Sequence, residues 1–124
     1  MYHKIDRQFA QAFRHMLDRL SAYAMPDGKT LLEHGVSVWY NDNANGPAHS
    51  RDNVPWIIAG SANGFLKQGQ YVDVTGGAGN HAQVLNTLGS AAGVRKPDGS
   101  YLDDFGDASL RSAGFTGLRS ELLA

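Results

Sequence analysis

The sequence predicts a small α/β fold, on the basis of three patterns along its 124 residues. Apolar residues recur at three- and four-residue spacing over residues 2–24, which is the pattern of an amphipathic helix. Two short runs rich in β-branched and aromatic residues, VSVWY at 36–40 and VPWIIAG at 54–60, indicate buried strands. A second periodic segment at 81–94 predicts another helix, so helices and strands share one layered architecture.

The N-terminal helix is predicted to gather its apolar residues on one face. The opposite face is filled by polar and charged residues, namely Arg7, Gln11, Arg14, Asp18 and Arg19. Pro26 disfavours helical backbone at the residue before it, and Asp27-Gly28 is a turn signal, so the helix is expected to end near residue 24. The apolar face comprises Ile5, Phe9, Ala12, Met16, Leu20 and Tyr23, with Phe13 and Leu17 beside it.

The segments between these elements read as connections, with one further strand. Residues 31–35 are a short connector, and the composition of residues 41–53 is that of a loop. A turn is expected near residues 67–69, followed by a short third strand at 70–74 and a loop at 75–80. A sheet of two to three strands is thin, which suggests part of a larger sheet or a chain that assembles with others.

The later helix and the C-terminus complete the prediction. Val84, Leu85, Leu88 and Ala92 share one face of the helix, and Gly93 is its expected stop. The last thirty residues are rich in turns and form a loop-rich C-terminus. Their apolar residues, expected to anchor this segment against the core, are Phe105, Leu110, Phe115 and Leu118.

Composition argues against several classes of partner. The formal net charge is −1 and the 11 Lys and Arg residues are dispersed, so electrostatics favour neither nucleic acid nor an anionic membrane surface. The chain lacks cysteine, which excludes disulfides, thiolate metal sites and cysteine nucleophiles. No run approaches the roughly 18 apolar residues of a membrane span, and the N-terminus lacks the pattern of a signal peptide.

The polar loop after the first strand is a candidate divalent-metal site. Ligands in open α/β sheets bind at the carboxyl ends of strands, and the polar residues 41–46 follow the first predicted strand at such an end. Asp42 and Asn43 offer hard oxygen ligands, as calcium and magnesium prefer, and His49 would add a nitrogen suited to zinc or manganese. Loops of this composition are common, so the spacing alone is weak evidence.

Several segments, in order, resemble the alkaline phosphatase and sulfatase superfamily. KTLLEHGVSVWYNDNANG is similar to its strand that ends in two metal ligands, and NHAQVLNTLGSAAGV to its closing helix. A closer resemblance is to the C-terminal region of an uncharacterised group of exported bacterial proteins in that superfamily. It is carried by YHKIDRQFAQAFRHMLDRL, TLLEHGVSVWY, AHSRDNVPWIIAG, FLKQGQYV, LNTLGSAAGV and DDFGD, which together cover nearly the whole chain.

The resemblance implies one partial alkaline-phosphatase-like domain over residues 1–124. It makes Asp42 and Asn43 metal ligands, with His49 and Asp52 near the same site and His81 at the head of the last helix. Complete relatives would hydrolyse a small anionic phosphate or sulfate ester, using a nucleophile from an N-terminal half that these residues lack. We therefore expect the isolated chain to be inactive, and the resemblance suggests an exported or periplasmic protein.

Structural explanations compete with each of these assignments. Asp42 and Asn43 would then form an Asx-turn that ends the strand, and Asp52 would cap its loop or pair with Arg51. Either Asn80 or His81 would cap or begin the last helix. The other histidines are expected to be surface or structural positions, namely His3, His15 and His34. In the rival hypothesis the chain is a non-catalytic binding or assembly module. Its polar loop then has a structural role only, and its long helix packs against a partner chain. That partner can be a second copy of the chain in a homo-oligomer.

Overall fold

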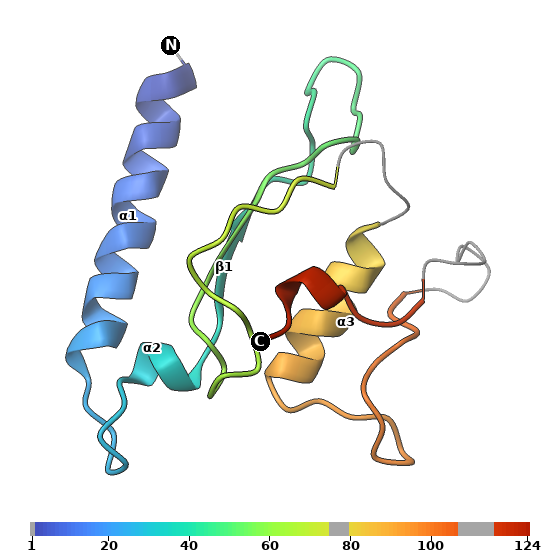
Figure 1. Cartoon of the computed structure of the whole chain (residues 1–124). Helices are drawn as coiled ribbons and strands as arrows, with labels where there is room; N and C mark the ends of the chain where they lie inside the picture. Colours follow the sequence, from blue (N-terminus) through green and yellow to red (C-terminus); the bar gives the residue numbers. More distant parts are fainter. Residues whose placement is uncertain (1, 75–79, 107–115) are drawn as a thin grey trace. The chain divides into compact units, whose positions relative to one another are not determined.

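The computed structural model describes residues 2–74, 80–106 and 116–124, in two compact units formed by residues 1–63 and 64–124. The first unit contains α1 (Tyr2–Ala22), α2 (Leu31–His34), β1 (Ser37–Tyr40) and β2 (Trp56–Ala59). The second contains α3 (His81–Ala91) and the 3-10 helix η2 (Ser120–Leu122) (Figure 1). The described elements are those of a small fold of mixed helix and strand, as predicted, whereas the alkaline-phosphatase-like layer and the single partial domain stay predictions.

In unit 1, β1 and β2 form an antiparallel hairpin whose connection is the polar loop, residues 41–55. The register pairs Trp39 with Ile57 and Tyr40 with Trp56. Because successive side chains alternate between faces, these two pairs lie on opposite faces of the hairpin. Phe13 of α1 contacts Trp39 with the ring centroids 6.0 Å apart, so α1 lies on the Trp39 face.

The sheet and the short connector differ from the prediction. Residues 70–74 form no strand, so the described sheet has only its two hairpin strands. Residues 31–34 form α2, because Thr30 and Glu33 make a capping box in which each side chain binds the other residue's backbone N–H. Those bonds from Thr30 lower the pKa of the Glu33 carboxyl. The spacing Thr-x-x-Glu in the sequence was the signal for this helix.

The turn between α1 and α2 is stabilised by a histidine. His34 Nε2 lies 3.0 Å from a carboxylate oxygen of Asp27, and the Lys29 N–H donates to the same carboxylate. The contact with His34 is the main cause of a lowered pKa of Asp27, and the Lys29 N–H adds to it. His34 is therefore a structural residue in unit 1, as the sequence predicts.

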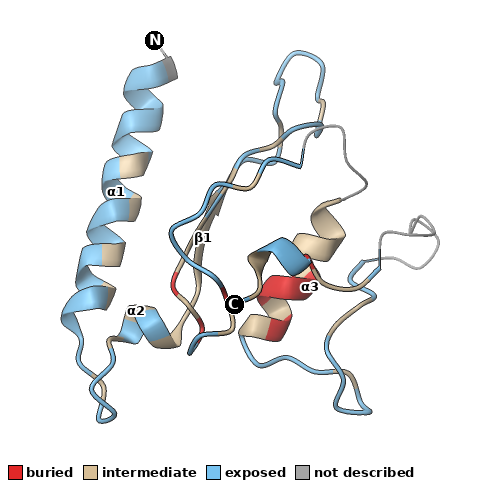
Figure 2. Ribbon diagram, in the orientation of Figure 1, coloured by how far each residue is buried: buried red, intermediate tan, exposed pale blue. Residues whose placement is uncertain are grey.

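Only part of the predicted apolar face of α1 is covered. Phe13, Leu17 and Leu20 are half-buried, and this group is called the inner stripe. The other residues of the predicted apolar face are exposed (Figure 2). This group, called the outer stripe, comprises Ile5, Phe9, Ala12 and Met16 of α1 and Tyr23, which directly follows the helix.

In unit 2, α3 begins and ends at the predicted signals. The Asn80 side chain accepts a hydrogen bond from the Gln83 N–H, so Asn80 is the N-cap and His81 the first helical residue. Gly93, at φ +88°, follows the last turn and lets the chain leave the helix. The C-terminus returns to pair Leu123 with Leu66 in an antiparallel bridge.

The buried face of α3 is polar, which the sequence did not predict. Asn86, Thr87 and Ser90 are almost completely buried, together with Leu88 (Figure 2). Their side chains bind the backbone of two irregular segments, residues 102–105 and 116–119. Of the expected C-terminal anchors, Phe105 is half exposed and Leu118 half-buried, while Leu110 and Phe115 lie outside the described residues.

Candidate functional site

The polar loop is an ordered connection with a tight turn at its tip. The Ala44 N–H donates to the Ser50 carbonyl at 2.8 Å, and the Ser50 N–H donates to the Asn45 carbonyl at 3.2 Å. The Asn45 side chain accepts a further bond from the Ala48 N–H at 3.3 Å. Much of the loop's Asn and Ser content is thereby explained by its own geometry.

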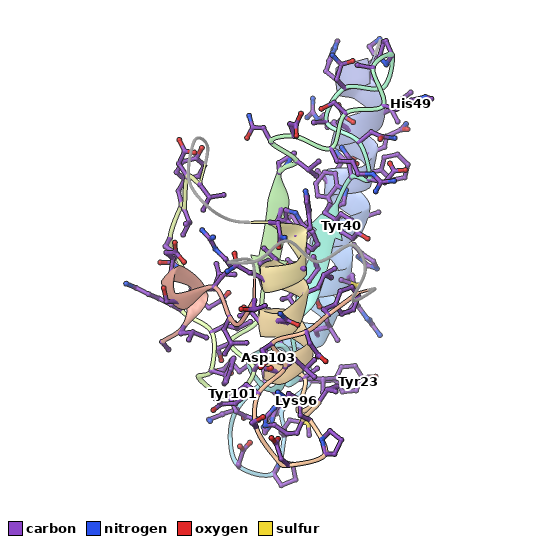
Figure 3. The ribbon with its side chains drawn as sticks, turned by 90° about the vertical axis from the view of Figure 1, so that its right-hand side faces the viewer. Tyr23, Tyr40, His49, Lys96, Tyr101 and Asp103 are labelled. Atoms are coloured by element: carbon purple, nitrogen blue, oxygen red, sulfur yellow. The ribbon has the colours of Figure 1, made fainter. Side chains whose placement is uncertain are left out.

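The loop brings three of the four predicted metal ligands onto one segment of unit 1. Asp42 and Asn43 follow β1 directly, and the Asp42 side chain is exposed while Asn43 is partly covered. His49 is exposed in the turn, at φ +48°, and lies on the loop beyond the end of the hairpin where Tyr40 lies (Figure 3). An exposed carboxylate, an amide and an imidazole on such a loop can at most hold a cation whose remaining ligands are water.

Asp52 has the structural role that competes with its predicted place near the site. Its carboxylate accepts a hydrogen bond from the Ser50 hydroxyl at 2.9 Å, and its N–H donates to the same hydroxyl at 3.1 Å. These reciprocal bonds fix the end of the turn. Asp52 thus caps its loop, which was the structural explanation that the sequence offered.

The fourth predicted ligand, His81, belongs to the other unit. It is the half-buried first residue of α3, directly after the Asn80 cap. Within residues 2–74, 80–106 and 116–124, no three His, Asp or Glu side chains are grouped closely enough to hold a metal ion. An asparagine oxygen can also bind a cation, so the site of Asp42, Asn43, His49 and His81 stays a prediction.

Other charged contacts in unit 2 are structural. Lys96 binds both carboxylate oxygens of Asp103, at 3.1 and 3.0 Å, and this contact raises the pKa of the lysine (Figure 3). The Arg95 guanidinium lies 4.6 Å from the centre of the Tyr101 ring, which also packs edge-on against Phe65. These contacts close the turn at residues 96–100 onto the body of unit 2.

The sequence prediction missed that several large apolar side chains of unit 1 are exposed. Ile5, Phe9, Met16 and Tyr23 of the outer stripe expose 45, 60, 41 and 58% of their surface. The available signal was the width of the apolar arc of α1. At about 100° per residue, the two stripes span about 140° of the helix, which is more than one two-stranded hairpin covers.

None of the helices in the described parts of the chain is both long and apolar enough to span a membrane. Comparison of the whole chain with protein-family models, with curated proteins and with solved structures gives no match.

Proposed function

We propose that this chain is a non-catalytic assembly module that associates with a protein surface through the outer stripe of α1. The observation that supports this function is a row of four large apolar side chains, each two-fifths or more exposed, three of them along one side of α1 and the fourth, Tyr23, directly after its end. Single exposed apolar residues are ordinary in monomeric proteins, whereas a contiguous row marks an interaction surface.

The hairpin explains why only one side of α1 is covered. The inner stripe packs toward Trp39, where Phe13 makes its aromatic contact. The outer stripe is rotated away from that contact by the helical repeat, so the hairpin does not reach it. Burial of the exposed parts of Ile5, Phe9, Met16 and Tyr23 would stabilise an interface by about 1 kcal/mol for each side chain.

We expect the double substitution Phe9→Gln and Met16→Gln to remove exposed apolar surface without harming the fold. The free energy of unfolding should change by no more than about 0.5 kcal/mol, because neither side chain fills the core. Binding of the dye ANS to about 1 μM protein should fall several-fold, since ANS reports exposed apolar surface. Chemical unfolding followed by tryptophan fluorescence gives the first quantity, and dye fluorescence gives the second.

The matched control is Phe13→Gln with Leu17→Gln on the inner stripe of the same helix. These substitutions introduce the same chemistry where the side chains pack on the hairpin, so they should destabilise unit 1 by about 2 kcal/mol or more. The proposal fails if the outer-stripe variant is as unstable as the inner-stripe variant, or if ANS binding does not distinguish the outer-stripe variant from the parent chain.

A second candidate function follows the superfamily resemblance, in which the polar loop would contribute to a divalent-metal site for ester hydrolysis. It is favoured by the position of Asp42 and Asn43 directly after β1, with His49 on the same ordered loop. The part of the chain that the structure describes gives the side chains of Asp42 and His49 no hydrogen bond or ion pair, so they are free to bind a ligand.

Manganese titration tests this second candidate without relying on catalysis. We expect Mn²⁺ to broaden the amide NMR signals of residues 42–49 at lower concentration than those around other exposed carboxylates, because three donors share this loop. Asp42→Asn should remove the difference. Asp6→Asn, which removes an exposed carboxylate from α1, is the control. Equal broadening around Asp42 and Asp6 would leave the loop with a structural role only.

A further inference from the structure

We propose that the surface covering the outer stripe is the outer stripe of a second copy of this chain, with the two α1 helices antiparallel. This inference rests on the proposed function and identifies the partner. It is drawn from the spacing of the stripe, from the sizes of its side chains and from the position of its one charged neighbour.

The spacing of the outer stripe suits the pairing of two helices. Phe9, Met16 and Tyr23 follow one another at seven-residue intervals, while Ile5 precedes Phe9 by four residues and Ala12 stands between Phe9 and Met16. A seven-residue repeat keeps an apolar seam on one side of a helix, so two such helices can lie along each other. Arg19 occupies the next position in the same series after Ala12.

An antiparallel arrangement pairs large side chains with small or complementary ones. We place the two-fold axis at the height of residue 14 along the helix. Each seam residue then faces the residue of the other copy for which the two residue numbers add up to 28. Met16 then faces Ala12 of the other copy, and Ile5 faces Tyr23. A large side chain opposite a small one lets the two surfaces interdigitate, as they do in well-packed cores.

Charge selects this orientation over a parallel one. Arg19, which the sequence pattern assigns to the polar face, continues the seven-residue series of Ile5 and Ala12 at the edge of the seam. In the antiparallel register it faces the exposed ring of Phe9. A guanidinium over an aromatic face is a favourable cation–π contact. A parallel, in-register pair would instead bring the two Arg19 side chains together, where like charges repel.

The size of the surface determines the strength expected. A helix of 21 residues is about 31 Å long, and all the seam residues lie within it except Tyr23, which follows it directly. One helix face buries less than the roughly 800 Å² per partner that is usual for stable complexes. We therefore expect a reversible dimer whose population rises with protein concentration.

The chain has no cysteine, so single introduced cysteines can report the geometry directly. Under mild oxidation, we expect Ala12→Cys mixed with Met16→Cys to form a disulfide-linked heterodimer. Neither variant alone should cross-link to a comparable extent. Position 12 of one copy lies opposite position 16 of the other copy, and neither position lies opposite itself. Mass spectrometry of the non-reduced mixture distinguishes the three products.

Sedimentation velocity over a range of concentrations measures the association itself. Arg19→Glu should weaken dimer formation at least tenfold, since it replaces the cation on Phe9 with an anion. Arg7→Glu is the matched control, because it makes the same charge change on the opposite side of α1 and should leave association within about twofold.

Three results would overturn the inference. The chain could stay monomeric at every concentration, or Met16→Cys alone could cross-link as efficiently as the mixture, which indicates parallel helices. Arg7→Glu could also weaken the dimer as strongly as Arg19→Glu. A monomer whose ANS binding still falls in the Phe9→Gln and Met16→Gln variant would retain the assembly function and exclude a second copy as the partner.

Discussion

Gly60→Ala is expected to lower the free energy of unfolding of unit 1 by about 3 kcal/mol or more. Gly60 is buried directly after β2, at φ +99°, a region that residues with a side chain seldom adopt. An added Cβ would lie 2.4 Å from the Gly35 carbonyl oxygen and 2.6 Å from that of Leu32. Both neighbours are backbone atoms, which cannot rotate away, so a steric cost of about 1–3 kcal/mol adds to a conformational cost of similar size.

The close approach at Gly60 exists because the chain after β2 binds the end of α2. The Ala62 N–H donates to the Gly35 carbonyl at 3.1 Å, and the Asn63 N–H to the Glu33 carbonyl at 2.8 Å. The Ser61 hydroxyl donates to the same Glu33 carbonyl at 3.0 Å. These bonds satisfy the carbonyls at the C-terminus of α2, so displacing Gly60 would disturb both the cap and the hairpin.

Gly28→Ala separates the two costs. Gly28 lies in the same unit at φ +84°, and an added Cβ there meets nothing within 4 Å. This control should therefore show the conformational cost alone, about 1 kcal/mol. Both tryptophans of the chain, Trp39 and Trp56, lie in the hairpin, so denaturant unfolding followed by their fluorescence reports unit 1. Equal unfolding midpoints for the two variants would contradict the predicted clash at Gly60.

Periodicity and turn chemistry were enough to predict most elements of this chain. The helix at residues 2–24, the strands around Trp39 and Ile57 and the helix that starts at His81 all form close to their predicted bounds. The third strand at 70–74 does not form. Its sequence has the local preference for a strand, but a strand also requires a neighbour with open hydrogen-bonding groups, and local sequence does not specify that partner.

The direction in which a helix buries its faces was harder to predict. The outer and inner stripes of α1 are equally apolar, and only the position of the hairpin decides which one is covered. In α3 the buried face contains Asn86, Thr87 and Ser90, whereas polar helix residues usually face water. One signal was present, because α3 contains no Asp, Glu, Lys or Arg and so has no strongly hydrated face.

The candidate metal site was predicted from residue types whose convergence depends on tertiary structure. Asp42, Asn43 and His49 are neighbours in sequence, so their position on one loop follows from the hairpin. His81 is more than thirty residues away and belongs to the second unit. The prediction took the loop as the carboxyl end of a strand in an open α/β sheet, whereas in the structure the loop connects the two antiparallel strands of the hairpin, β1 and β2.

Asn86→Ala is expected to destabilise unit 2 by about 3 kcal/mol. The Asn86 side chain is 0% exposed. Its Nδ2 donates to the Gly117 carbonyl at 3.0 Å, and its Oδ1 accepts from the Phe105 N–H at 2.9 Å. Alanine would leave one backbone donor and one backbone acceptor without partners, each costing about 1–3 kcal/mol where water cannot replace the amide.

Gln83→Ala is the matched control on the same face of α3. Gln83 donates to the Thr116 carbonyl at 3.1 Å and accepts from the Arg119 guanidinium at 3.3 Å, but its side chain is only half-buried, so water can replace much of both bonds. Its cost should be about 1 kcal/mol. Hydrogen–deuterium exchange of α3 and of residues 102–105 and 116–119 gives both values, and equal loss of protection in the two variants would show that Asn86 has no special role.

Asn86→Asp tests the direction of the two hydrogen bonds by changing the pH. At neutral pH the carboxylate still accepts from the Phe105 N–H but faces the Gly117 carbonyl with a second acceptor, in a buried position. Burial raises the pKa of such a carboxyl group above its unfolded value, so the variant should gain stability relative to the parent chain as the pH falls through that raised pKa. The protonated acid can then donate to the Gly117 carbonyl, as the amide does. A stability difference between variant and parent that stays constant from pH 7 to pH 4 would contradict this assignment of donor and acceptor.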